Sequence, residues 1–395
     1  MIEKRRTLVV GQSGGATAVT NATLAGVVRA ACRSGRYDRL LGARYGTTGI
    51  LREEFVDLCQ FEPESLQTLA RTPSAALGTS RVRLDTADLD LVLDSLRKAD
   101  TGALILIGGN DSADTALRVG HAARARGWSL PVVLAPKTVD NDLPMTDHSP
   151  GYGSAARCFA SIVRDSTWDS LAAPDLYPVK FIDVMGRNAG WLAAAASLAF
   201  AAEGGLDQPI VLLPERPPVD ADSIIDLVGA RVGERGMAIC IVPETLKVAD
   251  GTPLSNGEAE HIDPFGHPYR MPPAVLLAKR CRDRLGLNAR FERPGSFVRM
   301  AGGSETDRTE AVLVGEAAVI AANVDESGVM VTLEREPGPE YHCSTGLTAL
   351  ESVANTERML DDAFIKDDGM GLTRAFFDYA LPLIGSEPFP PYWSL

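Results

Sequence analysis

Cysteine is scarce in this 395-residue chain, and none of the six cysteines belongs to a Cys-x-x-Cys pair. Closely spaced cysteines are the usual signature of a zinc site or a disulfide framework, so the sequence indicates neither. We therefore expect reduced, mostly buried thiols, which are typical of a cytoplasmic protein.

Long hydrophobic runs are also absent. After the basic N-terminus the apolar residues 8–10 give way at once to Gly11, whereas a signal peptide needs roughly 7–15 apolar residues. Residues 191–202 are apolar but fall short of the roughly 20 residues of a membrane span. We expect no membrane partner, and residues 7–10 are better interpreted as a first β-strand.

Positive charge is in deficit, because 39 Lys and Arg stand against 52 Asp and Glu, for a net charge of −13. Such a chain is a poor binder of nucleic acid, which we exclude as a partner, and a bound anion needs a local basic pocket. The apolar share of 45% and the charged share of 23% indicate an ordinary folded protein of about two domains.

What the chain does contain is a repeated pattern of a short apolar run, a turn and a helical stretch. This alternation is typical of parallel βαβ units, in which the turns meet at the carboxyl edge of the sheet. The expected strands are residues 7–10, 103–107, 131–135, 181–184, 210–213 and 237–242. The expected helices are residues 21–32, 113–126 and 189–202, and the expected surface loops are 214–219, 249–273 and 335–343.

The glycine turn GGNDS at 108–112 follows the second of these strands. Two glycines let backbone N–H groups approach a phosphate, and the start of the next helix adds a positive dipole. The alternative is an ordinary strand-to-helix turn capped by Ser112.

The turn PKTVDND at 136–142 carries a lysine, a hydroxyl and two carboxylates. Lys137 can hold a phosphate, one carboxylate can act as a general base toward a sugar hydroxyl, and another can hold Mg²⁺. A solvated polar turn is the alternative interpretation.

Two further strand ends carry charge. Arg187 in Met185-Gly186-Arg187 can grip an anion or form a surface ion pair. Glu244 can accept hydrogen bonds from sugar hydroxyls or favour the start of a helix.

Together and in this order, these motifs resemble the phosphofructokinase family over nearly the whole chain. The matching segments are SGG near the N-terminus, GTSR at 78–81, GGNDS, PKTVDND, PGYGSA at 150–155, MGR, Pro243-Glu244 and Asp307-Arg308. The resemblance implies an α/β fold of two Rossmann-like three-layer domains with mostly parallel sheets. Residues 1–150 plus about 297–365 would bind the phosphoryl donor, and 151–296 plus the C-terminal tail the sugar phosphate. It also implies a homodimer or larger oligomer with shared active sites.

The resemblance further implies roles for individual residues. The catalytic group is Asp140 as general base toward the sugar 1-hydroxyl, with Thr138, Lys137 and Arg187. The donor-binding residues are Gly14, Gly15, Arg81, Gly109, Asn110, Asp111, Ser112 and Lys137. The sugar-phosphate residues are Thr138, Asp140, Asp142, Met185, Gly186, Arg187, Glu244, Arg290 and Arg299. Mg²⁺ is the implied cofactor, with Asp111 and Asn110 as candidate ligands.

Two positions bear on the donor. ATP users of the family resemble GGDGS and PGTIDND, whereas this chain has Asp111 and Lys137 where they have glycine. A carboxylate at 111 would take the room of the α-phosphate and ribose and repel that phosphate, while Lys137 suits compact pyrophosphate. We therefore expect reversible transfer from pyrophosphate to fructose 6-phosphate. A shift of the loops that admits ATP is the alternative.

The acceptor is less well defined by the sequence. Ser296 stands where the family usually has a larger ring, and Pro178 where many relatives have an arginine, for which Lys180 could compensate. A different sugar phosphate, such as sedoheptulose 7-phosphate, is therefore an alternative acceptor with either donor. A biosynthetic kinase of a sugar or nucleoside phosphate and a catalytically silent regulatory relative are further alternatives. Asn110, where most relatives have aspartate, weakens the metal prediction more than the reaction class.

Overall fold

The computed structural model describes residues 5–201, 208–255, 257, 261–262, 268–301, 303–338, 340–369, 371–386 and 389. The chain forms two compact units. Unit 1 comprises Met1–Thr138, Asp142–Tyr152 and Glu305–Arg358, and unit 2 comprises Val139–Asn141, Gly153–Ser304 and Met359–Leu395. Among the described residues, no helix combines the length and apolarity needed to cross a membrane.

Unit 1 is built on a seven-stranded sheet in the order β13-β12-β5-β4-β1-β2-β3. The five central strands are parallel, and only the edge strands β3 and β13 pair antiparallel with their neighbours. The strands are β1 (Arg5–Gln12), β2 (Tyr37–Ala43), β3 (Phe55–Asp57), β4 (Thr101–Gly108), β5 (Val132–Pro136), β12 (Val329–Arg335) and β13 (Cys343–Ala349).

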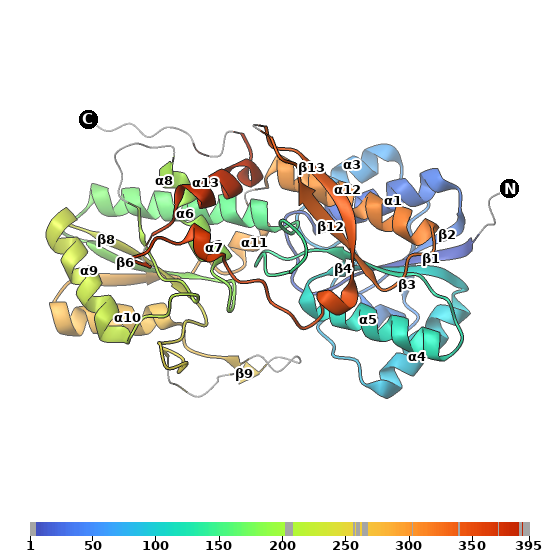
Figure 1. Ribbon diagram of the computed structural model, residues 1–395, viewed down its shortest axis with the longest axis horizontal. Coiled ribbons are helices and arrows are strands. Elements are labelled where there is room, and N and C mark those ends of the chain that lie inside the picture. Colours follow the sequence, from blue (N-terminus) through green and yellow to red (C-terminus); the bar gives the residue numbers. More distant parts are fainter. Residues whose placement is uncertain are drawn as a thin grey trace. The chain divides into compact units, whose positions relative to one another are not determined.

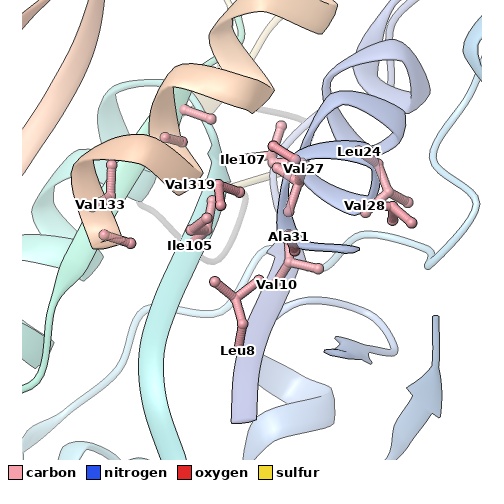
Figure 2. Packing of buried hydrophobic residues seen from close by; sticks show 14 of the residues in the cluster. Leu8, Val10, Leu24, Val27, Val28, Ala31, Ile105, Ile107, Val133 and Val319 are labelled. Atoms are coloured by element: carbon pink, nitrogen blue, oxygen red, sulfur yellow. The ribbon is translucent and has the colours of Figure 1, made fainter. Parts of the chain in front are cut away.

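Helices cover both faces of this sheet, with α1 and α12 on one face and α4 and α5 on the other (Figure 1). Figure 2 shows Leu8 and Val10 of β1 on the side of Val27 in α1 and Val319 in α12. Val9 belongs to the opposite core, because successive strand residues alternate between faces. The helices of unit 1 are α1 (Thr20–Ser34), α2 (Thr47–Leu51), α3 (Pro63–Arg71), α4 (Thr86–Lys98), α5 (Asn110–Ala125) and α12 (Glu305–Asn323), with the 3-10 turn η1 (Leu350–Ser352).

Unit 2 is built on a four-stranded parallel sheet in the order β11-β6-β8-β7. Phe181 of β6 packs with α9 and α10, while the neighbouring Lys180 bonds to α6 on the other face (Figure 1). The strands are β6 (Val179–Val184), β7 (Ile210–Val211), β8 (Ala238–Pro243) and β11 (Ala289–Glu292), with the separate pair β9 (His261–Ile262) and β10 (Pro268–Tyr269). The helices are α6 (Tyr152–Ala172), α7 (Trp191–Ala195), α8 (Leu198–Ala201), α9 (Ala221–Arg235), α10 (Pro273–Leu285), α11 (Phe297–Met300) and α13 (Arg374–Ala380), with the 3-10 turns η2 (Asp362–Phe364) and η3 (Leu381–Ile384).

The two three-layer α/β units confirm the predicted fold class, and all six predicted strands are present. The helix predicted over 189–202 is wrong as a single element, because α7 and α8 are separated by i−3 hydrogen bonds at Ala196 and Ser197. Its last residue, 202, lies outside the described residues, as does part of the predicted loop 249–273, which also contains β9 and β10. The assignment of one domain to the donor and the other to the sugar phosphate stays a prediction.

Candidate active site

Three turns meet at the carboxyl edge of the unit 1 sheet. The turns after β1 and β4 contain glycine pairs, and the turn after β5 contains Lys137. Strands β1, β4 and β5 are neighbours and parallel, with Gln12 opposite Ile107 and Gly108 opposite Pro136. The turns that follow these strands therefore lie side by side, as expected for the ligand-binding edge of a parallel sheet. The structure thus brings together the SGG, GGNDS and PKT segments.

Lys137 joins these turns. Its side chain is only 3% exposed, and its Nζ donates a hydrogen bond to the carbonyl oxygen of Gly15 at 2.8 Å. A Cβ atom at Gly14, whose φ is 74°, would lie 3.2 Å from this Nζ. The predicted donor residues Gly14, Gly15 and Lys137 are therefore in direct contact, and Gly14 leaves the room that the ammonium needs.

The first turn of α5 follows β4 directly. Gly109 is its N-cap residue and no side chain caps the helix, while the Ser112 N–H donates to the Gly109 carbonyl at 3.0 Å. The alternative in which Ser112 caps the turn is therefore wrong. An uncapped helix start offers backbone N–H groups and a positive dipole, which suits an anion.

Asn110 and Asp111 differ in their fitness to hold a metal ion. Both amide atoms of Asn110 already bond to the protein backbone. Nδ2 donates to the Thr356 carbonyl at 2.5 Å, and Oδ1 accepts from the Asn355 N–H at 2.7 Å. The Asp111 carboxylate is half-buried and bonds to no residue that the structure describes. One carboxylate plus substrate phosphates is a common ligand set for Mg²⁺, so Asp111 fits and Asn110 does not. The described residues hold no cluster of three or more His, Cys, Asp or Glu ligands.

Two hydrogen bonds hold Thr138 within unit 1. Its Oγ1 donates to Asp142 Oδ1 at 3.3 Å, and its N–H donates to the Pro150 carbonyl at 3.1 Å. The adjacent Gly151 N–H donates to Oδ1 of the buried Asp307 at 2.8 Å. The late Asp307 motif therefore supports the turn that carries Thr138.

Arg81 follows a segment that is bonded to the end of β1 and to the start of α1. Asn21 bonds to the backbone of this segment, donating to the Thr72 carbonyl at 3.0 Å and accepting from the Ala76 N–H at 2.7 Å. Gln12 accepts from the Leu77 N–H at 2.9 Å. The Arg81 side chain itself is exposed.

In unit 2, Asp140 is half-buried beside a residue in the left-handed conformation. Asn141 has a φ of 55°, and its Nδ2 donates to the Tyr379 hydroxyl at 2.9 Å. Asparagine tolerates this conformation better than most residues. The buried Asn141 thus anchors the backbone next to Asp140.

Arg187 and Glu244 are brought together at the ends of β6 and β8, where Val184 faces Pro243. Gly186 and Arg187 turn the chain with φ values of 131° and 50°, and the Arg187 N–H donates to the Glu244 carboxylate. Burial and the nearby Asp183 raise the pKa of Glu244, and Arg293 and Arg187 oppose this shift. No helix starts at Glu244, so that alternative is wrong.

The two arginines predicted to bind the 6-phosphate are not joined to this cluster by any described contact. Arg290 is exposed on β11, with its guanidinium carbon 3.7 Å from the centre of the Tyr177 ring. Arg299 is half-buried in α11, and its side chain bonds to no described residue. Lys180 is buried and donates to Asp169 at 2.6 Å and to the Ser166 carbonyl, so its suggested compensation for Pro178 is wrong.

Two further carboxylates, Glu215 and Asp183, were not predicted as site residues from the sequence. Glu215 Oε1 accepts from the Gly190 and Leu360 N–H groups at 2.8 Å each, although its segment was predicted to be a surface loop. Asp183 is 4% exposed, pairs with Arg293 Nε at 3.0 Å, and burial raises its pKa to about 6. An acidic residue inside an apolar strand was the signal that could have identified Asp183.

Comparison with known proteins agrees with the motifs. A family model described as Phosphofructokinase matches residues 7–322. A pyrophosphate–fructose 6-phosphate 1-phosphotransferase of Xanthomonas campestris pv. campestris is 38% identical, over 98% of this chain and 96% of the relative. A sulfofructose kinase of Alkalicoccus urumqiensis is 30% identical, over 91% and 92%. The crystal structure of a pyrophosphate-dependent phosphofructokinase from Nitrosospira multiformis has a TM-score of 0.87 and 33% identity, over 98% of this chain and 94% of that one.

Proposed function

The chain belongs to the phosphofructokinase family, and on that premise we propose that it transfers a phosphoryl group from pyrophosphate to the 1-hydroxyl of fructose 6-phosphate. The products are phosphate and fructose 1,6-bisphosphate, and the reaction runs readily in both directions. The names of the Xanthomonas and Nitrosospira relatives support this choice of donor and acceptor.

The observation that carries the choice of donor is the position of Lys137. Its buried Nζ lies against the Gly14–Gly15 turn, at the same edge of the sheet as the start of α5. Two phosphates joined directly carry a dense negative charge that an ammonium and backbone N–H groups can neutralise. The Asp111 side chain in the first turn of α5 occupies room that a glycine would leave for the α-phosphate of a nucleotide.

The proposed mechanism leaves little covalent work to the protein, because phosphoryl transfer depends on alignment and charge neutralisation. Asp140 accepts the proton of the sugar 1-hydroxyl as that oxygen bonds to the transferred phosphorus. The bond from this phosphorus to the bridging oxygen breaks, and inorganic phosphate leaves. Lys137 and the N–H groups of the α5 start hold the donor while Thr138 orients the transferred group.

The acceptor is held by residues of unit 2. The Arg187 guanidinium pairs with the sugar phosphate, and Glu244 accepts hydrogen bonds from sugar hydroxyls. Arg290 and Arg299 bind the 6-phosphate, and the unbonded, half-buried Arg299 is suited to an anion. Family precedent places some of these groups in a neighbouring subunit, so the working form is a homodimer or larger.

Family members generally need a divalent metal, and we assign Mg²⁺ with Asp111 as its protein ligand. When bound, the ion neutralises charge on the donor oxygens. The expected compartment is the cytoplasm.

A second acceptor is favoured by one observation. Ser296 is exposed where the family has a larger ring, and Lys180 does not replace the arginine missing at Pro178. A larger or differently substituted sugar phosphate, such as sedoheptulose 7-phosphate, is therefore the second candidate acceptor. The name of the Alkalicoccus relative, a sulfofructose kinase, supports variation of the acceptor within this branch.

The test is a panel of donors and acceptors on the purified protein with Mg²⁺ varied. Pyrophosphate and ATP are each combined with fructose 6-phosphate and sedoheptulose 7-phosphate, and kcat/KM is measured for each pair. We expect pyrophosphate with fructose 6-phosphate to give the highest value. A higher kcat/KM with ATP would overturn the donor, a clear preference for sedoheptulose 7-phosphate would overturn the acceptor, and no turnover with any pair would favour a silent regulatory relative.

A further inference from the structure

A short segment of unit 1 lies against the first turn of α5. We call residues 353–358, which follow η1, the strap. The Asn355 N–H donates to Asn110 Oδ1 at 2.7 Å, and the Thr356 carbonyl accepts from Asn110 Nδ2 at 2.5 Å. The Asn355 side chain adds a hydrogen bond to Asp114 Oδ1 at 3.0 Å. The strap is therefore tied to the helix start by three hydrogen bonds.

The strap is also fixed at its far end and from beneath. The Arg358 N–H donates to the Asp142 carbonyl at 2.7 Å, and Arg358 Nη1 donates to the Thr146 and Asp147 carbonyls. Val353 is fully buried and belongs to the same core cluster as residues of α5. The strap thus runs from the start of α5 to the last residue of the PKTVDND turn.

The strap explains why residue 110 is asparagine in this chain, where most relatives have aspartate. The strap presents one donor and one acceptor to this side chain, and an amide supplies the matching acceptor and donor. A carboxylate has acceptors only, so it would lose one bond and face the Thr356 carbonyl with like polarity. Asparagine at 110 is therefore explained by the strap and not by a metal.

We propose that the strap is a donor-specificity element that excludes nucleoside triphosphates from the site that accepts pyrophosphate. Its backbone lies within hydrogen-bond reach of the side chain of the first residue of α5, where the proposed donor phosphates bind. A nucleoside attached to those phosphates needs room beyond them, and the strap takes that room on the Asn110 side. The strap acts in addition to Lys137 and Asp111, and its assignment rests on the proposed function for the location of the donor.

Asn355 offers a matched pair of variants that leave the catalytic and binding residues untouched. Its φ of 60° suits glycine, so Asn355→Gly keeps the backbone conformation and the N–H bond to Asn110. Asn355→Pro removes that N–H and requires a φ near −65°, which is incompatible with the strap. Comparing the two variants therefore distinguishes displacement of the strap, in Asn355→Pro, from loss of the Asn355 side chain alone, in Asn355→Gly.

The experiment measures ATP binding by calorimetry on the full chain, together with hydrogen exchange of residues 353–358. We expect Asn355→Pro to exchange faster in the strap and to bind ATP about tenfold more tightly, the equivalent of about one or two hydrogen bonds. Asn355→Gly should match the wild type in both measurements. The kcat/KM with pyrophosphate should stay within about threefold in both variants, because their donor residues are intact.

The proposal is overturned if Asn355→Pro exchanges faster in the strap while its ATP affinity stays at the wild-type value. Unchanged exchange in Asn355→Pro would also overturn it, since the strap would then not depend on its bond to Asn110. A wild type that transfers nothing from pyrophosphate would instead refute the proposed function. The ratio of ATP affinities between variant and wild type would still decide the role of the strap.

Discussion

The buried carboxylates of the two units differ in their hydrogen bonds. In unit 1, Asp307 accepts from the Gly151 N–H, and His148 bonds to Asp147 and Glu310. In unit 2, Oδ1 of Asp183 and Oε2 of Glu215 are buried without a hydrogen-bond partner among the described residues. A buried carboxylate oxygen without a donor is costly, and such exceptions occur at functional sites.

On the proposed function, this difference bears on how the donor and acceptor residues meet their ligands. The proposed donor residue Lys137 already has a protein partner in unit 1, so it is in place for a compact anion. Unit 2 holds unsatisfied acceptors and a left-handed Arg187 close to Glu244, which is the state expected of a site completed by a hydroxyl-bearing ligand.

The largest expected effect is at Asp140. We predict that Asp140→Asn lowers kcat by about 10²–10⁴-fold with a smaller change in either KM, because general-base help is lost while binding contacts remain. Steady-state kinetics with pyrophosphate and the preferred sugar phosphate measure this. Near-normal turnover would remove Asp140 from the mechanism.

The next effect distinguishes the proposed sugar-phosphate residues from the proposed donor residues. Arg299→Ala should raise KM for the sugar phosphate by roughly 10–100-fold, the value of a lost charge-assisted hydrogen bond, and leave KM for pyrophosphate nearly unchanged. Arg290→Ala should act in the same direction. If neither variant changes the acceptor KM, their assignment to the 6-phosphate is wrong.

The dependence of stability on pH should show the contrast between satisfied and unsatisfied groups. Both ring nitrogens of His148 face carboxylate oxygens, at 2.8 Å to Asp147 and 2.7 Å to Glu310. Since ionised carboxylates only accept, the ring carries both protons. Burial lowers the pKa of His148, but the hydrogen bonds and charges of the two carboxylates outweigh it and raise this pKa to about 9. Its stabilisation is complete below its ordinary pKa of 6.5 and is lost as the pH rises through about 9.

Asp183 should change the stability of the protein at lower pH than His148 does. Burial raises its pKa from 3.8 to about 6, so the folded chain keeps a proton that the unfolded chain releases, and stability falls as the pH rises between these values. Asp183→Asn should therefore stabilise the protein by roughly 2–3 kcal/mol at pH 7–8 and by little below about pH 4. His148→Gln should instead remove the loss of stability between about pH 6.5 and 9. Denaturant unfolding across this pH range measures both, and a wild-type profile in either variant would contradict its assigned role.

The smallest expected effect is at Glu215, which bonds to the backbone of Gly190 just after the Met185–Arg187 turn. A Cβ atom at Gly190 would lie 2.5 Å from Glu215 Oε2, so Gly190→Ala should displace this carboxylate and raise the sugar-phosphate KM by about threefold to tenfold. Gly233→Ala in α9 is the matched control, because nothing lies within 4 Å of its Cβ position. The control should slightly stabilise the helix and leave both KM values unchanged. Equal effects of the two variants would show that Glu215 has no part in acceptor binding.

The local features of the site were predictable because each is contained within a few residues. A strand followed by a glycine or lysine turn identified the three turns at the edge of the unit 1 sheet, and the MGR and Glu244 turns in unit 2. Helices and strands that are not bounded by such turn residues were not predicted. The α12 helix is an example, because α1 and the sheet surround it and its buried face carries alanine and glycine rather than a clear apolar stripe.

The sequence by itself determined the family, the α/β class and the residue types that favour pyrophosphate, since these depend on short motifs and on the alternation of strands and helices. Only the tertiary structure decided which distant residues support those motifs: Asp307 beneath Gly151, Leu360 with Glu215, and the strap on Asn110. Each of these bonds joins segments more than a hundred residues apart, and their meeting depends on sheet order and packing, which no local pattern contains.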